Sequence, residues 1–257
     1  MEADSAGIEW LAANWPAPPH VHAGTTMRFG GVSAPPYDQL NLGTHVNDEQ
    51  YNVLVNRELL RKHLKLPIEP SWLNQIHGNN IIQLDSTMES TLTNQTADGS
   101  YSNQENKVCV VMTADCLPLL LCNDEGTQIA AVHIGWRGFC KNIVNAALDK
   151  FTCPHDHLMA WLGPCICPEH YETGSEVRSA CLAVFNDAED AFTPSKPGHW
   201  ETDIHRLLTL YLKQQGVQKI YGEQRCTYHE NEKFFSYRKN KNTGRMASLI
   251  WINSIQS

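Results

Sequence analysis

Clustered positive charge is missing from this 257-residue sequence. It contains 20 Lys and Arg against 28 Asp and Glu, so the formal net charge at pH 7 is -8, and no block of basic residues occurs along it. A protein that binds nucleic acid needs a basic surface to attract the phosphate backbone. The composition therefore argues against a nucleic-acid partner.

Long apolar segments are also missing. No run reaches the roughly 18 uninterrupted apolar residues of a membrane-spanning helix. The first ten residues, MEADSAGIEW, carry acids where a secretory leader would carry basic residues and then an apolar stretch. We therefore expect a soluble, cytoplasmic protein with no membrane partner.

Internal repeats, low-complexity tracts and Gly/Ser linkers are absent too, so nothing marks a boundary between domains. A chain of this length can bury a substantial core. Predicted strands and helices follow one another in a mixed order rather than as regular strand-helix-strand units. We expect one α+β domain, a mixed α/β layered sandwich, over residues 1–257.

The sequence contains nine cysteines but neither a CxxC nor an HExxH motif. An odd number in a chain too long to need disulfide staples indicates reduced thiols, most of them buried as small apolar side chains. Cys165 and Cys167, in GPCICPEHYETG, are expected to be core residues in this sense. No local motif by itself predicts a metal site.

Apolar spacing and turn residues predict the main elements. Asp48 and Asp203 each stand where they could cap a helix. The segment 107–122 is apolar enough for a strand buried on both faces, or for two strand segments meeting near Pro118. The remaining predictions are helices at 48–66, 139–151, 175–185 and 203–216, and strands at 127–135, 157–163, 217–222, 234–238 and 246–252.

A tight reversal at residues 123–126, NDEG, would pair 116–122 with 127–133 as antiparallel strands. The numbers of two facing residues would then add up to 249, which places Cys116 directly across from His133. A thiolate and an imidazole suit Zn²⁺, and His77, beside Gly78 in a bend between apolar segments, is the best candidate for a third ligand. Three protein ligands leave a fourth position open, as in catalytic zinc sites.

Two other interpretations of the same residues stay open. Cys116 and His133 could simply be core residues, or His133 could deprotonate Cys116 to give a nucleophilic thiolate. Asp115 could not orient His133 by adjacency to Cys116, because neighbouring strand residues point to opposite faces.

Four arginines in turn-like contexts are candidates for binding an anion. The sequence GWRG, residues 135–138, precedes a predicted helix whose first N–H groups could assist Arg137, although these glycines could merely make a bend. The other candidates are Arg28, Arg238 and Arg245. The paired histidines at positions 20 and 22 and at 155 and 157 are too few for the copper centres of a multicopper oxidase.

Several ordered motifs resemble the YfiH or laccase-domain family, in its bacterial single-domain form. They extend over residues 28–251 and read NQIHG, ADGSYS, TADCLPLLLCN, AAVHIGWRG, WLGPCICPEHYETGSEV and CTYHENEKFFSYRKNKNTGRMAS. The resemblance implies one zinc ion at His77, Cys116 and His133. It departs from the family at Cys165 and Cys167, where related chains more often carry small or apolar residues, which leaves room for an additional metal or redox sensitivity.

The resemblance also implies purine nucleoside phosphorylase activity on adenosine, inosine, guanosine and methylthioadenosine, with adenosine deaminase activity. Phosphorolysis needs an anion cradle, which the four arginines could supply, and deamination needs an activated water and an acid/base group such as Asp115 or Glu172. The alternatives are a Cys-His amidase that edits cell-wall precursors, a metal-stabilised binding module and a copper polyphenol oxidase. Phosphate and purine nucleosides are the expected partners.

Overall fold

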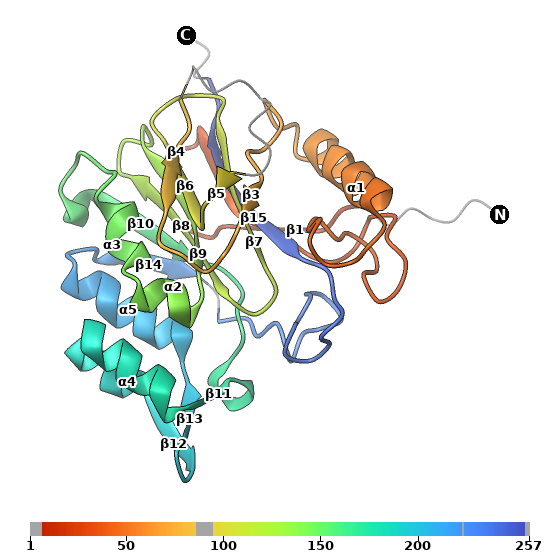
Figure 1. Cartoon of the computed structure of the whole chain (residues 1–257). Helices are drawn as coiled ribbons and strands as arrows, with labels where there is room; N and C mark the ends of the chain where they lie inside the picture. The colour runs from red at the N-terminus through yellow and green to blue at the C-terminus, as the bar shows by residue number, and fades with distance from the viewer. Residues whose placement is uncertain (1–6, 86–94, 223, 255–257) are drawn as a thin grey trace.

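Two β-sheets packed face to face form the centre of the molecule (Figure 1). The computed structural model describes residues 7–85, 95–222 and 224–254; residues 1–6, part of the acidic start from which no secretory leader is expected, lie outside them. One sheet has the order β1 (Trp10–Ala12), β2 (Val21–Thr26), β15 (Met246–Ile252), β7 (Val108–Thr113). The other has the order β14 (Lys219–Gly222), β10 (Leu158–Leu162), β8 (Leu117–Asn123), β9 (Ile129–Ile134), β6 (Gly99–Ser102), β4 (Ile81–Gln83).

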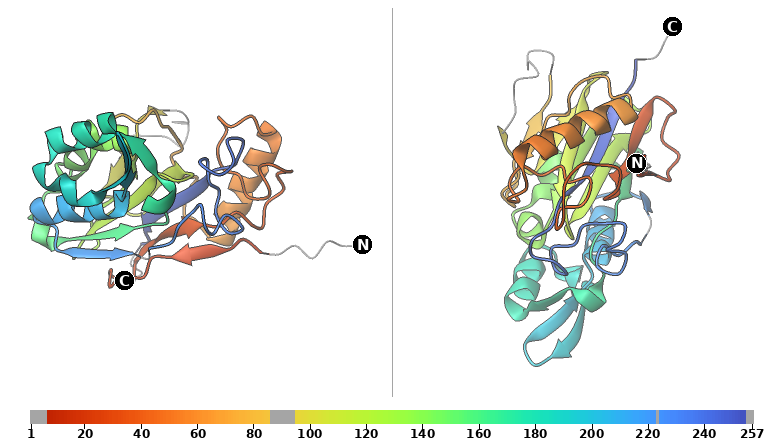
Figure 2. Two further views of the ribbon diagram at one scale, coloured as in Figure 1. Left: turned by 90° about the horizontal axis from the view of Figure 1, so that it is seen from below. Right: turned by 90° about the vertical axis from the view of Figure 1, so that its right-hand side faces the viewer.

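Helices cover the outer faces of both sheets (Figure 2). Helix α1 (Gln50–His63) lies across the four-stranded sheet. On the six-stranded sheet lie α2 (Trp136–Cys140), α3 (Ile143–Leu148), α4 (Ser175–Val184) and α5 (Ile204–Gln214). Smaller sheets are formed by β11 (Glu172–Gly174), β13 (His199–Thr202) and β12 (Phe192–Lys196), and by β3 (Leu73–Asn74) and β5 (Gln95–Thr96).

Side-chain alternation along the central strands explains this layering. In β8, Leu119 and Leu121 pack toward the helices, whereas Leu120 and Cys122 pack toward the other sheet. Strand β15 likewise divides its side chains between the inter-sheet core and the core under α1. Both faces of such strands are buried, so their sequences read as continuous apolar runs. The predicted mixed α/β layered fold is confirmed.

Most of the predicted elements are present, with three corrections. Segment 107–122 is two strands that belong to different sheets, and the chain leaves the first at Ala114, before Pro118. The predicted helix 139–151 is broken into α2 and α3 because Asn142 is left-handed, with φ 63°. Residues 234–238 form an irregular loop that ends in a turn rather than a strand; their apolar run reflects the complete burial of Phe234 and Phe235.

The two predicted helix caps differ in outcome. Asp203 accepts a hydrogen bond from the Arg206 N–H at the start of α5, as predicted. Asp48 does not cap α1, which begins after Glu49. Its carboxylate instead accepts hydrogen bonds from Ser33 and Asn41, so it ties the segment before the helix together.

The β8–β9 hairpin exists, but its register differs from the predicted one by two residues. The numbers of facing residues add up to 251, so Pro118 rather than Cys116 lies across from His133. The loop is longer because the Asn123 side chain accepts hydrogen bonds from the Thr127 and Gln128 N–H groups, at 2.8 and 2.9 Å.

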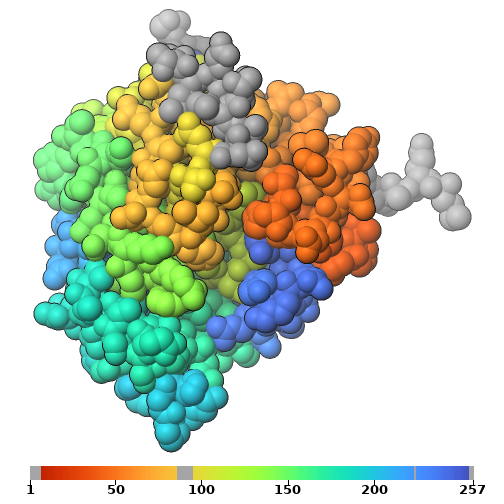
Figure 3. Space-filling model, in the orientation of Figure 1, coloured from red at the N-terminus to blue at the C-terminus, as the bar shows by residue number. Residues whose placement is uncertain are grey.

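Among the described residues, no helix combines the length and the apolar character needed to cross a membrane. On the face shown in Figure 3, the orange-to-yellow stretch around β3 and β4 lies at the surface beside the green residues of α2 and α3. The blue C-terminal loop lies below it. The residues predicted as metal ligands lie among these segments.

We predict that Asn123→Ala lowers the free energy of unfolding by about 1–3 kcal/mol, because two loop N–H groups lose their acceptor. Urea denaturation measures the change. Glu125→Ala in the same loop is the control: Glu125 is exposed, so its removal should change stability by less than about 0.5 kcal/mol. Equal stability of the two variants would contradict the role of Asn123.

Candidate metal centre and active site

Three side chains, two from bends of the chain and one from a strand, meet where the chain crosses between the sheets. His77 lies between β3 and β4, Cys116 lies just before β8, and His133 lies near the end of β9. Their donor atoms all lie within 4.8 Å of one another. The Cys116 Sγ is 3.9 Å from His77 Nε2, and the two imidazole rings meet edge to face at 4.7 Å. The structure thus brings together all three residues predicted as metal ligands.

Cys116 reaches this position through a turn rather than through strand pairing. Asp115 has a φ of 91°, which reverses the chain as it leaves the four-stranded sheet. Its backbone oxygen accepts a hydrogen bond from Ile166, and its carboxylate accepts bonds from Thr227 and Arg238. This left-handed conformation is uncommon outside glycine, and here three hydrogen bonds hold the residue in place. The predicted proximity of Cys116 and His133 was right, but the predicted cross-strand pairing was wrong.

Asp98 organises both histidines. Its fully buried carboxylate accepts hydrogen bonds from the consecutive N–H groups of Ile76, His77 and Gly78, at 3.1, 2.9 and 2.6 Å. It also contacts His133 Nδ1 at 2.9 Å. Such a carboxylate fixes the tautomer of the imidazole and turns Nε2 toward a metal ion. Sequence reasoning assigned no role to Asp98, although it is part of the ADGSYS motif.

Gly135 allows the close approach of these groups. A Cβ atom at this position would lie 2.9 Å from His77 Cδ2 and 3.2 Å from Cys116 Sγ. The backbone of GWRG therefore forms part of the wall behind the ligands. Glycine is needed here for space, since its φ of -95° is open to any residue.

The electrostatics of the site favour a thiolate beside an imidazolium. Burial opposes ionisation of Cys116, but His133 and His77 outweigh it and lower its pKa to about 6. Burial likewise opposes protonation of His133, but Cys116 and Asp98 raise its pKa to about 9. A cation placed between these groups would replace the proton as the partner of the thiolate.

The donor set fits a transition-metal ion. Two nitrogens and one sulfur are common zinc ligands, and in a tetrahedral site a sulfur and a nitrogen stand about 3.6 Å apart. The distance between Cys116 Sγ and His77 Nε2 is 3.9 Å. With Asp98 on His133 Nδ1, the outer hydrogen bond expected of a histidine ligand is also present.

A cavity of about 430 Å³ opens beside the three ligands. Of the four arginines predicted to bind an anion, Arg137 and Arg245 line it. The cavity is also lined by residues that sequence reasoning missed: His45, Gln75, Met112, Thr113, Ala114 and Tyr237. Gln75, Thr113, Ala114 and Tyr237 lie within the family motifs quoted above, but nothing in the sequence shows that these motifs meet at one cavity. His45 and Met112 lie outside those motifs, so only the fold could identify them.

Other candidate residues lie outside this cavity lining. Arg28 donates hydrogen bonds to the backbone oxygens of Asp38 and Asn231 and forms an ion pair with the Asp38 carboxylate at 3.3 Å. Arg238 donates to the backbone oxygen of Glu172, whose carboxylate pairs with Lys196.

The carboxylate of Asp115, predicted as an acid/base group, contacts Thr227 and the Arg238 backbone instead. It therefore supports the turn that precedes Cys116.

The paired histidines of the sequence take part in ordinary contacts. His22 stacks on Trp251, and His20 contacts the Gly126 carbonyl at 3.2 Å. His155 contacts the Gln215 carbonyl, and His157 pairs with Asp124. None of these four histidines belongs to a cluster of potential metal ligands in the described part of the chain.

The fold and the site together define a class: a layered α/β protein with a partly buried His-Cys-His centre at the edge of a cavity. The family model described as multi-copper polyphenol oxidoreductase laccase matches residues 22–253. The chain belongs to this family, which confirms the resemblance seen in the sequence.

Relatives match over nearly the whole chain. The purine nucleoside phosphorylase YfiH of Escherichia coli is 46% identical over 242 residues, 94% of this chain and 98% of that protein. A purine nucleoside phosphorylase of Pseudomonas aeruginosa is 43% identical over 244 residues, 95% of this chain and 98% of its own. The crystal structure of Neisseria meningitidis protein NMB0706 is similar with a TM-score of 0.90 at 40% identity, covering 95% of this chain and 99% of that one.

We predict that Asp98→Asn weakens metal binding by about 10–100-fold, because the charge that orients His133 is lost while the side-chain size is kept. Competition with a chelator of known affinity measures the change. Asp149→Asn, an exposed carboxylate just after α3, is the control and should bind metal as the wild type does. An unchanged affinity for Asp98→Asn would contradict this role.

A second prediction concerns the space beside the ligands. Gly135→Ala should reduce metal affinity by about tenfold or more, because the new Cβ displaces His77 and Cys116 and the geometry of a zinc site is narrow. Metal content after gel filtration measures it. Gly7→Ala is the control, since a Cβ there meets no atom within 4 Å. Full metal occupancy in both variants would show that the site tolerates the methyl group.

Proposed function

We propose that this protein is a zinc-dependent purine nucleoside phosphorylase, acting on adenosine, inosine, guanosine and methylthioadenosine, and that the same cavity deaminates adenosine. The names of relatives that match 94–95% of the chain support an enzyme of this kind. The observation that carries the proposal is a cavity that combines a His-Cys-His centre with two arginines and an exposed tyrosine.

Phosphate would be bound by Arg137 and Arg245. A guanidinium donates two parallel hydrogen bonds to an oxyanion, which fixes its orientation as well as its position. Arg137 lies at the surface over the Trp136 ring, at 4.4 Å. Arg245 is anchored by hydrogen bonds to the Thr243 and Gly244 carbonyls, and burial lowers its pKa. One arginine is thus open to solvent and the other is held in place.

The nucleoside would occupy the rest of the cavity. Tyr237 is 46% exposed and offers a ring on which a purine can stack. Thr113 also lines the cavity, and its buried hydroxyl has no hydrogen-bond partner among the described residues. Burial, with Arg245 and Arg57, lowers the pKa of His45 to about 4. A neutral His45 can donate one N–H to the departing purine without adding a positive charge.

His77, Cys116 and His133 would hold the zinc ion. When bound, zinc supplies Lewis acidity toward an oxygen of the substrate or of water. The protein itself contributes orientation: Asp98 holds His133, and Gln75 exchanges two hydrogen bonds with the Met112 backbone beside the cavity. All nine cysteines are free thiols, which supports a reducing compartment such as the cytoplasm as the site of the reaction.

One observation favours a second candidate, the Cys-His amidase. Asp98, His133 and Cys116 form a carboxylate-imidazole-thiol series: His133 Nδ1 lies 2.9 Å from Asp98 Oδ1, and the donor atoms of His133 and Cys116 lie within 4.8 Å of each other. This is the arrangement of a cysteine hydrolase, with the orienting carboxylate at Asp98 rather than at Asp115. The two candidates differ in whether the thiolate holds a metal ion or attacks a carbonyl.

The phosphorylase proposal predicts phosphate-dependent release of adenine from adenosine. Replacing Arg137 by Gln should raise the KM for phosphate roughly 10-fold or more, because a charge-assisted hydrogen bond contributes about 1.5–3 kcal/mol. Chromatography with and without phosphate measures it. Arg206→Gln, on the exposed side of α5, is the control and should leave KM unchanged. Adenine release that is independent of phosphate, or an unchanged KM in Arg137→Gln, would contradict the proposal.

Chelation separates the two candidates. A phosphorylase that depends on the His-Cys-His centre loses turnover when the metal is removed and regains it when zinc is restored. A Cys-His amidase keeps its activity after chelation and loses it when Cys116 is alkylated. Inosine formed from adenosine by the metal-loaded protein, and not by the chelated one, would support the deaminase activity.

A further inference from the structure

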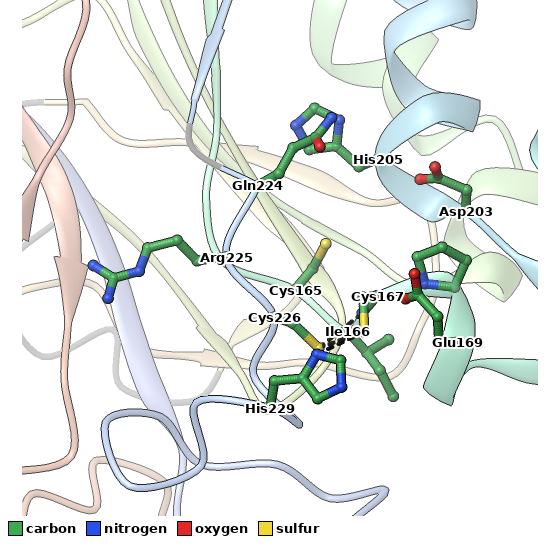
Figure 4. A pocket seen from close by; sticks show the side chains of 11 residues that line it. Cys165, Ile166, Cys167, Glu169, Asp203, His205, Gln224, Arg225, Cys226 and His229 are labelled. Atoms are coloured by element: carbon green, nitrogen blue, oxygen red, sulfur yellow. Dashed lines mark hydrogen bonds between the residues drawn. The ribbon is translucent and has the colours of Figure 1, made fainter.

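A second group of soft ligands lies away from the proposed active site, between the segments 165–170 and 226–229. These segments run side by side: Cys165 and Cys226 form an isolated parallel bridge, and the Thr227 N–H donates to the Cys165 carbonyl at 3.0 Å. The donor atoms of Cys167, Cys226 and His229 all lie within 4.8 Å of one another. They line a cavity of about 400 Å³, shown in Figure 4.

We propose that Cys167, Cys226 and His229 form a second metal site that binds Zn²⁺. Two thiolates and an imidazole are preferred zinc ligands, and a fourth position remains for Glu169 or water. Figure 4 shows the His229 ring facing the two sulfur atoms, at the end of the cavity opposite Gln224 and His205. The separation between Cys167 Sγ and His229 Nδ1 is 3.7 Å, close to the roughly 3.6 Å expected across a tetrahedral zinc ion.

The imidazole of His229 is held in the orientation that a ligand needs. Its Nε2 lies 2.7 Å from His170 Nε2, so one of these nitrogens donates to the other. When His229 donates, its Nδ1 carries a free electron pair directed at Cys167, as in most histidine ligands. The His170 ring is itself stacked on Tyr228, with 3.8 Å between ring centroids. His170 is therefore a positioning residue for His229.

Zinc binding requires the two sulfur atoms to move apart. Cys167 Sγ and Cys226 Sγ are 2.7 Å apart, whereas two thiolates on one zinc ion stand about 3.8 Å apart. Cys167 is only half-buried, so its side chain can rotate away from the buried Cys226. Binding releases the two thiol protons as the two Zn–S bonds form.

A metal ion here would also stabilise the turn that places Cys116 in the proposed active site. Residue Thr227, next to Cys226, donates a hydrogen bond to the Asp115 carboxylate at 2.7 Å, and the Ile166 N–H donates to the Asp115 backbone. Both segments that hold the second site therefore contact the turn that places Cys116. The second site would therefore be structural, and whether it binds zinc does not depend on the activity proposed above.

Metal content tests the proposal directly. The full-length protein, purified under reducing conditions, is loaded with Zn²⁺, gel-filtered and analysed by mass spectrometry. We expect about two zinc ions per chain in the wild type and about one in Cys167→Ser. Cys153→Ser, another half-buried cysteine outside both ligand groups, should keep about two. Equal zinc content in Cys167→Ser and the wild type would overturn the proposal.

A second measurement isolates the site. In Cys116→Ser, which lacks a ligand of the first centre, Co²⁺ should still produce a thiolate-to-cobalt absorption band, and Zn²⁺ should raise the melting temperature. Both effects should vanish in Cys116→Ser/Cys167→Ser. Absence of the band in Cys116→Ser would overturn the proposal. So would a wild-type mass two hydrogens lower under these reducing conditions, with the bond mapped to Cys167 and Cys226, since those thiols would then form a disulfide.

Discussion

The Asp98 carboxylate is the interaction on which the proposed active site depends. It is fully buried, and its charge is balanced by three consecutive N–H groups and by His133. Burial opposes its ionisation, but these hydrogen bonds outweigh burial and lower its pKa. A buried charge without such partners would be strongly unfavourable. The same bonds hold His77 at a φ of 55°, so one carboxylate determines the position of two ligands.

The site lies where the layered fold is interrupted rather than where it is regular. Strands β7 and β8 belong to different sheets, and the three residues between them include Asp115 and Cys116. A chain that changes sheets must turn sharply, and the turn brings a polar backbone and a thiol to the edge of an apolar core. Gly135 then leaves room for the ligands to meet. Rigid sheets on both sides fix a geometry that a flexible loop could not maintain.

The loop that precedes β15, within residues 224–245, contributes residues to both proposed metal sites. It contributes Cys226 and His229 to one, Tyr237 and Arg245 to the cavity of the other, and Thr227 to the turn between them. Its apolar residues Phe234 and Phe235 are completely buried and anchor it under β15. This explains why residues 234–238, which resemble a strand in sequence, form a loop instead. Their apolar side chains fill a separate small core rather than one face of a sheet.

The sequence by itself determined the elements in which local pattern and tertiary role agree: the helices α1, α4 and α5, the apolar central strands, and the family motifs that contain His77, Cys116 and His133. Tertiary structure alone decided the hairpin register, the break at Asn142, the contacts of Asp98, and the position of Arg137 and Arg245 in the cavity lining. The reason is physical. Periodicity records which face of an element is buried, whereas a site depends on side chains brought together from distant parts of the chain.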